Sequence, residues 1–190
     1  SCGVDAIVAE GFEAGGHNGR EETTTMCLVP DVAKAINVPL IAAGGIIDGK
    51  SMLAAMILGA DGVQMGTRFV ACKESSAHEN FKNMVLKSKE GDTRLTLKEI
   101  IPVRMMKNKF YKEVEELYKS SPSKEQLINK LGKGRAKLGM FEGDLEAGEL
   151  EIGQASSQIN KVFTAQEIIQ QIMTEFVSIK SQMLIANKFN

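Results

Sequence analysis

The sequence predicts an α/β fold built around a parallel β-sheet. Three apolar segments, at 5–9, 38–43 and 61–65, have the length of buried strands. Glycine follows each of them, and apolar residues at helical spacing follow the first two. Strands that alternate with helices are joined by right-handed crossovers, which make neighbouring strands parallel.

The first unit begins with the strand at 5–9 and continues into a polar, glycine-rich loop from Gly11 to about Thr25. Apolar residues at helical spacing then predict a helix over 29–36. Pro30 is expected in the first turn of this helix, where a missing N–H group costs nothing.

The second and third units are shorter. The strand at 38–43 ends at Gly44-Gly45, and the apolar spacing over 52–57 predicts a helix that Gly59 caps at its C-terminus. The third strand, at 61–65, ends at Gly66-Thr67.

The pattern changes to mainly helical spacing after about residue 76. Helices are predicted over 81–88 and 110–118. Ser123 and Thr164 each stand three residues before Gln or Glu, a capping-box pattern that opens two further helices. The glycine-spaced stretch over 132–153 is interpreted as a long loop or lid. We therefore expect two parts: βα units over 1–80, and a helical lobe with a glycine-rich lid loop and a closing helix over 81–190.

Three parallel strands are too few for a complete fold of this class. A doubly wound sheet needs about five strands and a β/α barrel needs eight. The chain also opens on Ser-Cys-Gly-Val-Asp, without an initiator methionine. We expect the C-terminal part of a larger fold, and poor solubility or completion by a second copy, as in a homodimer, if it is expressed alone.

The composition excludes several classes of protein. The chain has 23 Lys and Arg against 24 Asp and Glu, a balance that argues against a nucleic-acid binder with a basic footprint. No apolar run approaches the roughly 18 residues of a membrane span, and no signal peptide is evident. The cysteines, Cys2, Cys27 and Cys72, are odd in number and widely spaced, which favours a reducing, cytoplasmic location without disulfides.

The loop after the first strand holds the first group of candidate catalytic residues, Glu10-Gly-Phe-Glu-Ala-Gly-Gly-His17. Loops at the carboxyl ends of parallel strands commonly carry active sites. Gly15 and Gly16 allow the backbone to turn sharply and bring His17 near a ligand, where an imidazole can transfer protons. A surface histidine on a turn is the alternative, but the motif favours function. Glu10 and Glu13 either orient His17 or face solvent.

The two following strand ends predict a phosphate site. Gly44-Gly45 and Gly66-Thr67 place small residues with free backbone N–H groups where a strand gives way to a helix or turn. In β/α barrels the last two such loops often share one phosphate. The alternative is that the glycines merely end their strands.

Other sites have little support in the sequence. Dinucleotide-binding, Walker A, metal-binding and serine-hydrolase motifs are all lacking. His78 is expected to cap or pack near a helix start. Arg135 and Lys137 form a small basic patch for which solvation is favoured over contact with a phosphate-bearing ligand.

Taken together, the motifs resemble those of a known family. Ala9-Glu-Gly-x-Glu-Ala-Gly-Gly-His17-x-Gly, Leu40-Ile-Ala-Ala-Gly-Gly-Ile46 and Gly62-Val-Gln-x-Gly-Thr-Arg-Phe69 occur in this order. The set resembles the FMN-dependent nitronate monooxygenase family, formerly called 2-nitropropane dioxygenase, which includes enoyl-ACP reductase II. This resemblance implies a TIM (β/α)8 barrel of which the three strands are the sixth, seventh and eighth, with a helical C-terminal lobe.

The resemblance also implies roles for individual residues. His17 corresponds to the catalytic histidine beside the flavin. The positions that bind FMN in the family are matched here by Gly16, Gly44, Gly45, Gln64, Gly66 and Thr67. Gly153 and Gln154 match a tail segment that returns to the active site, and Glu10 is a further expected active-site contact. Asn18 stands where the family often has an aliphatic residue, and the earlier strands, with the Gly-Gly-Met flavin loop, have no counterpart here.

Three functions follow from these expectations. The first is FMN-dependent oxidation of alkyl nitronates with O₂, giving a carbonyl compound and nitrite. The second is enoyl-ACP reduction with NAD(P)H and FMN in fatty-acid synthesis. The third is a fragment that binds a phosphate-bearing ligand without turnover, and His17 distinguishes it because a binder needs no ionisable group there.

Overall fold

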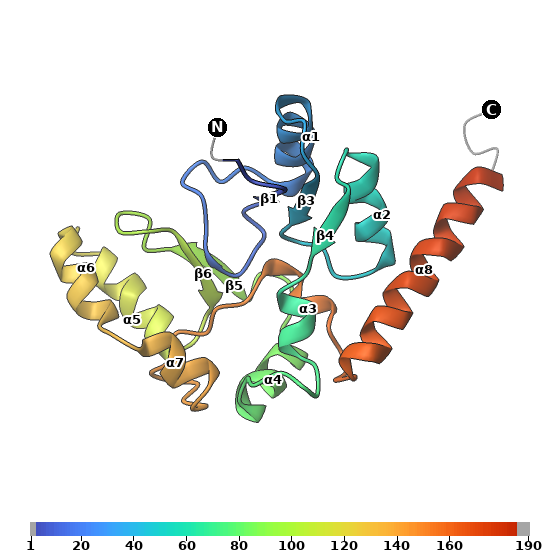
Figure 1. Cartoon of the computed structure of the whole chain (residues 1–190). Helices are drawn as coiled ribbons and strands as arrows, with labels where there is room; N and C mark the ends of the chain where they lie inside the picture. The colour runs from blue at the N-terminus through green and yellow to red at the C-terminus, as the bar shows by residue number, and fades with distance from the viewer. Residues whose placement is uncertain (1–2, 186–190) are drawn as a thin grey trace.

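The computed structural model describes residues 3–185, so Cys2 lies outside the described residues. A parallel sheet in the order β1-β3-β4 forms from β1 (Ile7–Glu10), β3 (Leu40–Ala43) and β4 (Gly62–Gln64). The helices α1 (Thr25–Ala35), α2 (Gly49–Ile57) and α3 (Thr67–Val70) follow the three strands in turn (Figure 1). The α/β class is therefore confirmed, and the described residues form no closed barrel.

The apolar side chains that predict these units make a common core. Ala9, Leu40 and Ala42 from the strands pack with Val29 of α1 and Ala55 of α2. Burying apolar surface between a sheet and its helices is the main stabilising contribution in such a layer.

The capping signals in this part have mixed outcomes. Gly59 has φ +110° directly after the end of α2, as expected for a C-terminal cap. The first helix begins at Thr25, earlier than predicted, and Pro30 therefore lies inside it. Its start escaped sequence analysis because the cap is formed by a distant side chain, as described below.

A second sheet lies in segments for which no strand was predicted. The strands β5 (Thr93–Thr96) and β6 (Val103–Met106) form an antiparallel pair, and β2 (Gly16–His17) adds to the other edge of β6. The predicted helical lobe over 81–190 therefore also contains a pair of strands that the sequence analysis did not predict. Strands of two to four residues carry a weak periodic signal, and a buried Arg104 interrupts the apolar pattern of β6.

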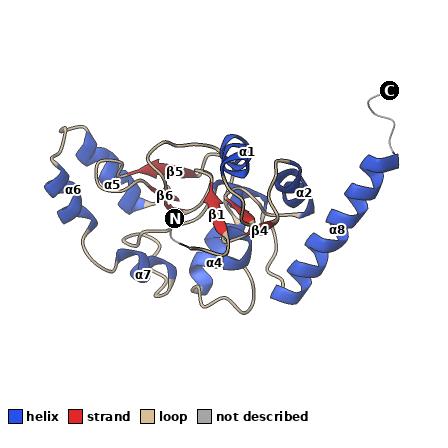
Figure 2. Ribbon diagram, turned by 45° about the horizontal axis from the view of Figure 1, so that its top comes forward, coloured by secondary structure: helices blue, strands red, loops and turns tan. Residues whose placement is uncertain are grey.

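The remaining elements surround both sheets. They are α4 (Glu79–Leu86), α5 (Lys109–Tyr118), α6 (Lys124–Leu131), α7 (Arg135–Met140), the 3-10 helix η1 (Gln154–Gln158) and α8 (Ala165–Ile185). Figures 1 and 2 show α8 beyond α2 on one side of the molecule and α5, α6 and α7 on the other. Both capping boxes form as expected, from Ser123 with Gln126 and from Thr164 with Glu167. The glycine-spaced stretch is a loop interrupted by α7.

The two expected parts share one core. Ile47 and Ala71 from the first part pack with Phe81, Leu150 and Ile152 from the second. Leu150 and Ile152 of the tail are therefore buried against the βα units.

Candidate active site

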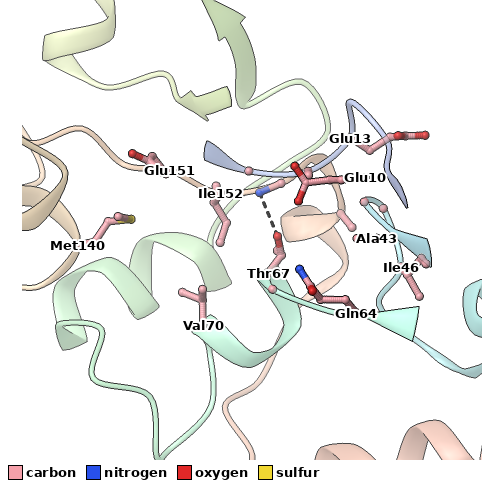
Figure 3. A pocket seen from close by; sticks show the side chains of 17 residues that line it. Glu10, Glu13, Ala43, Ile46, Gln64, Thr67, Val70, Met140, Glu151 and Ile152 are labelled. Atoms are coloured by element: carbon pink, nitrogen blue, oxygen red, sulfur yellow. Dashed lines mark hydrogen bonds between the residues drawn. The ribbon is translucent and has the colours of Figure 1, made fainter. Parts of the chain in front are cut away.

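A cleft lies at the carboxyl ends of the three parallel strands, with a volume of about 260 Å³. Seven of the predicted site residues line it: Glu10, Gly44, Gly45, Gln64, Gly66, Thr67 and Gly153. Figure 3 shows Glu10, Gln64 and Thr67 around this hollow, with Val70 and Met140 on the opposite wall. Residues far apart in the sequence therefore meet because parallel strands end at one edge of the sheet.

Glu13 and Thr25 fix the first loop of the cleft. The Glu13 carboxylate accepts hydrogen bonds from the backbone N–H of Thr25, at 3.0 and 3.1 Å, and from its hydroxyl at 2.9 Å. Glu13 thereby caps α1 from outside the helix. The Thr25 hydroxyl also lies 2.8 Å from the carbonyl oxygen of Gly44, so the loops after β1 and β3 are tied together.

The tail closes the cleft from the other side. The N–H of Gly153 donates to the hydroxyl of Thr67 at 3.0 Å, the dashed line in Figure 3. The N–H of Gln154 donates to the carbonyl oxygen of Glu13 at 2.9 Å. A Cβ on Gly153 would lie 2.7 Å from the Thr67 hydroxyl and 2.9 Å from the Glu13 carbonyl oxygen. Only glycine fits where these three segments cross.

Three predicted residues lie outside the lining of the cleft. His17 is exposed on β2, opposite Val103, and Gly16 is buried beside it. Gln154 is exposed and lines a neighbouring hollow with Glu13 and Gly45. His17 thus lies on the second sheet, outside the lining of the cleft.

Two residues hold the His17 loop: Arg104, which sequence analysis missed, and Asn18, which it noted only as a departure from the family pattern. Arg104 is buried; its Nε and Nη2 donate to the carbonyl oxygen of Phe12 at 3.0 and 2.8 Å, and its guanidinium stacks 5.0 Å from the Phe12 ring. The Asn18 amide donates to the carbonyl oxygens of Ala14 and Gly16. The sequence signal for Arg104 was a charged residue within an otherwise apolar four-residue strand.

Three carboxylates have raised pKa values, and two of them, Glu10 and Glu151, line the cleft. Burial at the end of β1 raises the pKa of Glu10, although part of its side chain reaches solvent. Burial raises the pKa of Glu151, and the charge of His17 opposes that shift. Burial, reinforced by the charge of Glu151, raises the pKa of Glu149 to about 7. Glu149 and Glu151 were not predicted as site residues, and their only signal was two acidic residues alternating with apolar ones.

The remaining sequence candidates are structural. His78 caps α4, its Nδ1 accepting from the N–H of Asn80 at 3.1 Å. Arg135 stacks on Phe110 and donates to backbone carbonyl oxygens, so it packs the lobe instead of facing solvent or the cleft. Within residues 3–185 no group of three or more His, Cys, Asp or Glu side chains is arranged to hold a metal ion. No helix described in the structure is long and apolar enough to cross a bilayer.

Comparison with known proteins identifies relatives of the chain. A family model described as nitronate monooxygenase matches residues 1–175. A probable nitronate monooxygenase of Staphylococcus saprophyticus is 41% identical over 154 residues, which are 73% of this chain and 43% of that protein. One from Staphylococcus haemolyticus is 36% identical over 189 residues, covering 91% of this chain and 52% of the relative.

Solved structures agree with these relatives. FabK from Thermotoga maritima superposes with a TM-score of 0.88 and 39% identity, over 95% of this chain and 57% of FabK. A nitroalkane oxidase from Streptomyces ansochromogenes gives a TM-score of 0.75 and 29% identity, over 95% and 54%. The chain spans about half the length of the relatives it matches. Since the family model extends over nearly all of the chain and the strand-end glycine loops lie together in one cleft, the chain belongs to the nitronate monooxygenase family.

Proposed function

We propose that this chain supplies one side of the FMN site of an oxidoreductase that oxidises alkyl nitronates with O₂ to a carbonyl compound and nitrite. The observation that carries the proposal is the cleft in which the loops after β3 and β4 meet, in a chain of this family. In this proposal β1, β3 and β4 are the sixth, seventh and eighth strands of a TIM barrel.

The residues of the cleft fit the phosphate end of FMN. A Cβ built on Gly66 meets no atom within 4 Å, so this backbone borders open space. The first N–H groups of a helix have no partner within the helix and favour anions, and α3 begins directly after Gly66. The cleft volume of about 260 Å³ is below the roughly 300–1,000 Å³ of complete small-molecule sites. The size suits a chain that provides only part of the flavin pocket.

The protein residues then have separate tasks. Gly44, Gly45, Gly66 and Thr67 would hold the phosphate, and Gln64 and Glu10, which also line the cleft, would contact the rest of the flavin. When bound, FMN supplies the redox chemistry, accepting electrons from the substrate and delivering them to O₂. His17 gives or takes the proton that accompanies this oxidation. The pairing of β2 with β6 fixes the backbone position of His17.

A second function has a specific observation in its favour. The fold superposes on FabK with a TM-score of 0.88 at 39% identity. The alternative is an enoyl-ACP reductase II that takes electrons from NAD(P)H through FMN, with an enoyl thioester as substrate. A non-catalytic phosphate-binding fragment is the third candidate, and a homodimer is the assembly we propose for either enzyme.

A pair of glycine variants tests the FMN site in the full chain. Gly66→Ala adds a methyl group to open space at φ −86°, so the protein tolerates it while the phosphate does not. We expect the affinity for FMN, measured by quenching of flavin fluorescence, to fall at least about tenfold, which corresponds to about 1.4 kcal/mol. The free energy of unfolding should stay unchanged or rise by up to about 1 kcal/mol.

Gly134→Ala is the matched control. Gly134 has φ +73°, lies outside the cleft and also meets no atom within 4 Å. This variant should lose about 1–2 kcal/mol of stability and keep its affinity for FMN. Wild-type affinity in Gly66→Ala would disprove the phosphate assignment. Two assays then distinguish the enzymes. Release of nitrite from a nitronate supports the monooxygenase, and consumption of NAD(P)H with an enoyl thioester supports the reductase.

A further inference from the structure

The hydroxyl of Thr25, at the start of α1, contacts the glycine loop Gly44-Gly45 at the end of β3. We infer that Thr25 is a positioning residue for this loop: by binding the carbonyl oxygen of Gly44, it aims the N–H group of Gly45 at the phosphate of the flavin. The inference rests on the proposed FMN site. It gives a role to a residue that sequence analysis left without one, and it makes Thr25 a determinant of the preference for FMN over riboflavin, the same flavin without the phosphate.

The backbone of the glycine loop depends on its surroundings for a single conformation. Gly44 and Gly45 have φ +94° and +69°, in the left-handed region that glycine adopts at low steric cost. Since glycine also populates many other conformations, two in succession form a defined loop only where neighbouring groups hold them. A Cβ on Gly44 would lie 2.6 Å from the carbonyl oxygen of Gly11 and 3.0 Å from the hydroxyl oxygen of Thr25. Gly44 is thus enclosed between these two residues.

The contact with Thr25 determines where the next N–H group points. The hydroxyl oxygen of Thr25 lies 2.8 Å from the carbonyl oxygen of Gly44 and 3.3 Å from that of Ala43. Among the described residues every peptide bond is trans, so the C=O of Gly44 and the N–H of Gly45 lie in one plane and point in opposite directions. A hydrogen bond that holds the Gly44 carbonyl toward Thr25 therefore turns the Gly45 N–H away from it.

The N–H group of Gly45 is available to a ligand. Gly45 is exposed and lines the cleft. Within residues 3–185 its N–H donates to no protein acceptor. Backbone N–H groups that are held in place and lack a protein acceptor bind phosphate oxygens by charge-assisted hydrogen bonds. The orientation set by Thr25 is therefore the orientation that a phosphate in this part of the cleft requires.

Thr25 is itself fixed by Glu13. The two carboxylate oxygens of Glu13 accept from the N–H of Thr25 at 3.0 and 3.1 Å, and Oε2 also lies 2.9 Å from the Thr25 hydroxyl. A hydroxyl has one hydrogen to donate. Because the backbone N–H already ties Thr25 to Glu13, this hydrogen is available for Gly44, whose oxygen is the nearer of the two. Figure 3 shows the Glu13 side chain directed away from Gln64 and Thr67.

The two preceding threonines differ from Thr25 in this respect. Thr24 is the N-cap residue of α1, but its side chain forms no capping hydrogen bond. Among the described residues, the Thr25 hydroxyl is the only one of the run 23–25 that forms hydrogen bonds. Thr24 therefore provides a control of the same size and chemistry, one position away.

Binding of two flavins to the full chain tests the role of Thr25. Thr25→Val keeps the shape of the side chain and removes the hydroxyl, whereas Thr25→Ser keeps the hydroxyl. Dissociation constants for FMN and for riboflavin are measured by fluorescence quenching. We expect Thr25→Val to bind FMN at least about fivefold more weakly, the loss typical of one hydrogen bond, with riboflavin affinity unchanged. Thr25→Ser and Thr24→Val should stay within about twofold of the wild type for both flavins.

The possible failures have different meanings. Unchanged FMN affinity in Thr25→Val would overturn the inference, and so would an equal loss for both flavins, which indicates a general effect on the fold. A wild type that binds FMN no more tightly than riboflavin would instead overturn the proposed phosphate site.

A second measurement examines the loop without any ligand. The ¹⁵N order parameter of the Gly45 amide should be about 0.85 in the wild type, in Thr25→Ser and in Thr24→Val, and below about 0.6 in Thr25→Val. The fall reflects a loop that has lost the contact holding its carbonyl. An order parameter that stays at the wild-type value in Thr25→Val would refute the positioning role, whether or not the chain binds flavin.

Discussion

Arg104 should be the main anchor of the loop that carries His17. In Arg104→Met the chain loses two charge-assisted hydrogen bonds to the carbonyl oxygen of Phe12, at 3.0 and 2.8 Å, together with the stacking contact at 5.0 Å. Hydrogen bonds from a charged donor contribute about 1.5–3 kcal/mol and a partly buried cation–π contact about 0.5–2 kcal/mol. Relief from burying a charge offsets part of this sum. We expect a net loss of about 2–4 kcal/mol in the free energy of unfolding.

Urea unfolding with linear extrapolation measures this loss. Arg94→Met is the matched control, since Arg94 is exposed on the adjacent β5, and its stability should remain within about 0.5 kcal/mol of the wild type. The N–H of Asn18, which donates to the carbonyl oxygen of Pro102 at 2.8 Å, should also exchange with solvent faster in Arg104→Met. If Arg104→Met unfolds at the same urea concentration as Arg94→Met, the loop is held by other contacts and the reasoning fails.

Two further outcomes are expected. Replacing His17 by Ala should lower turnover by about 10²-fold or more while FMN is retained, because the proposed general acid–base group is lost. Measurements of kcat and of flavin content on the same sample check this prediction. An unchanged kcat would remove His17 from the reaction. For Glu149, whose pKa in the folded state is about 7 against an ordinary value of 4.5, the folded state binds more protons than the unfolded state between these pH values. Stability should therefore fall as pH rises through this window, and Glu149→Gln should flatten the slope in a series of urea titrations; an identical slope in the variant would contradict the burial of this carboxyl.

The site residues differ in how far they were predictable. The glycine loops at the ends of β3 and β4 were predictable because a strand followed by glycine is a local pattern, and parallel strands bring such ends together. Glu13 was expected to orient His17 or to face solvent, and its actual partner Thr25 was not predictable, because the helix is capped by a carboxylate twelve residues earlier and not by a local capping box. Arg104 was hidden for a similar reason: a buried charge is accommodated by a carbonyl oxygen 92 residues away in the sequence.

The sequence by itself determined the α/β class, the three parallel strands, the capping boxes and the order of motifs that identify the family. All of these depend on residue spacing within a few turns or on one strand and its neighbour, where local sterics and apolar periodicity decide the outcome. Only the tertiary structure decided that β5 and β6 form a second sheet, that His17 lies on this sheet outside the cleft lining, and that the tail brings Glu151 over Gly16. These features depend on contacts between distant segments, where close packing selects glycine or a buried charge that no local pattern specifies.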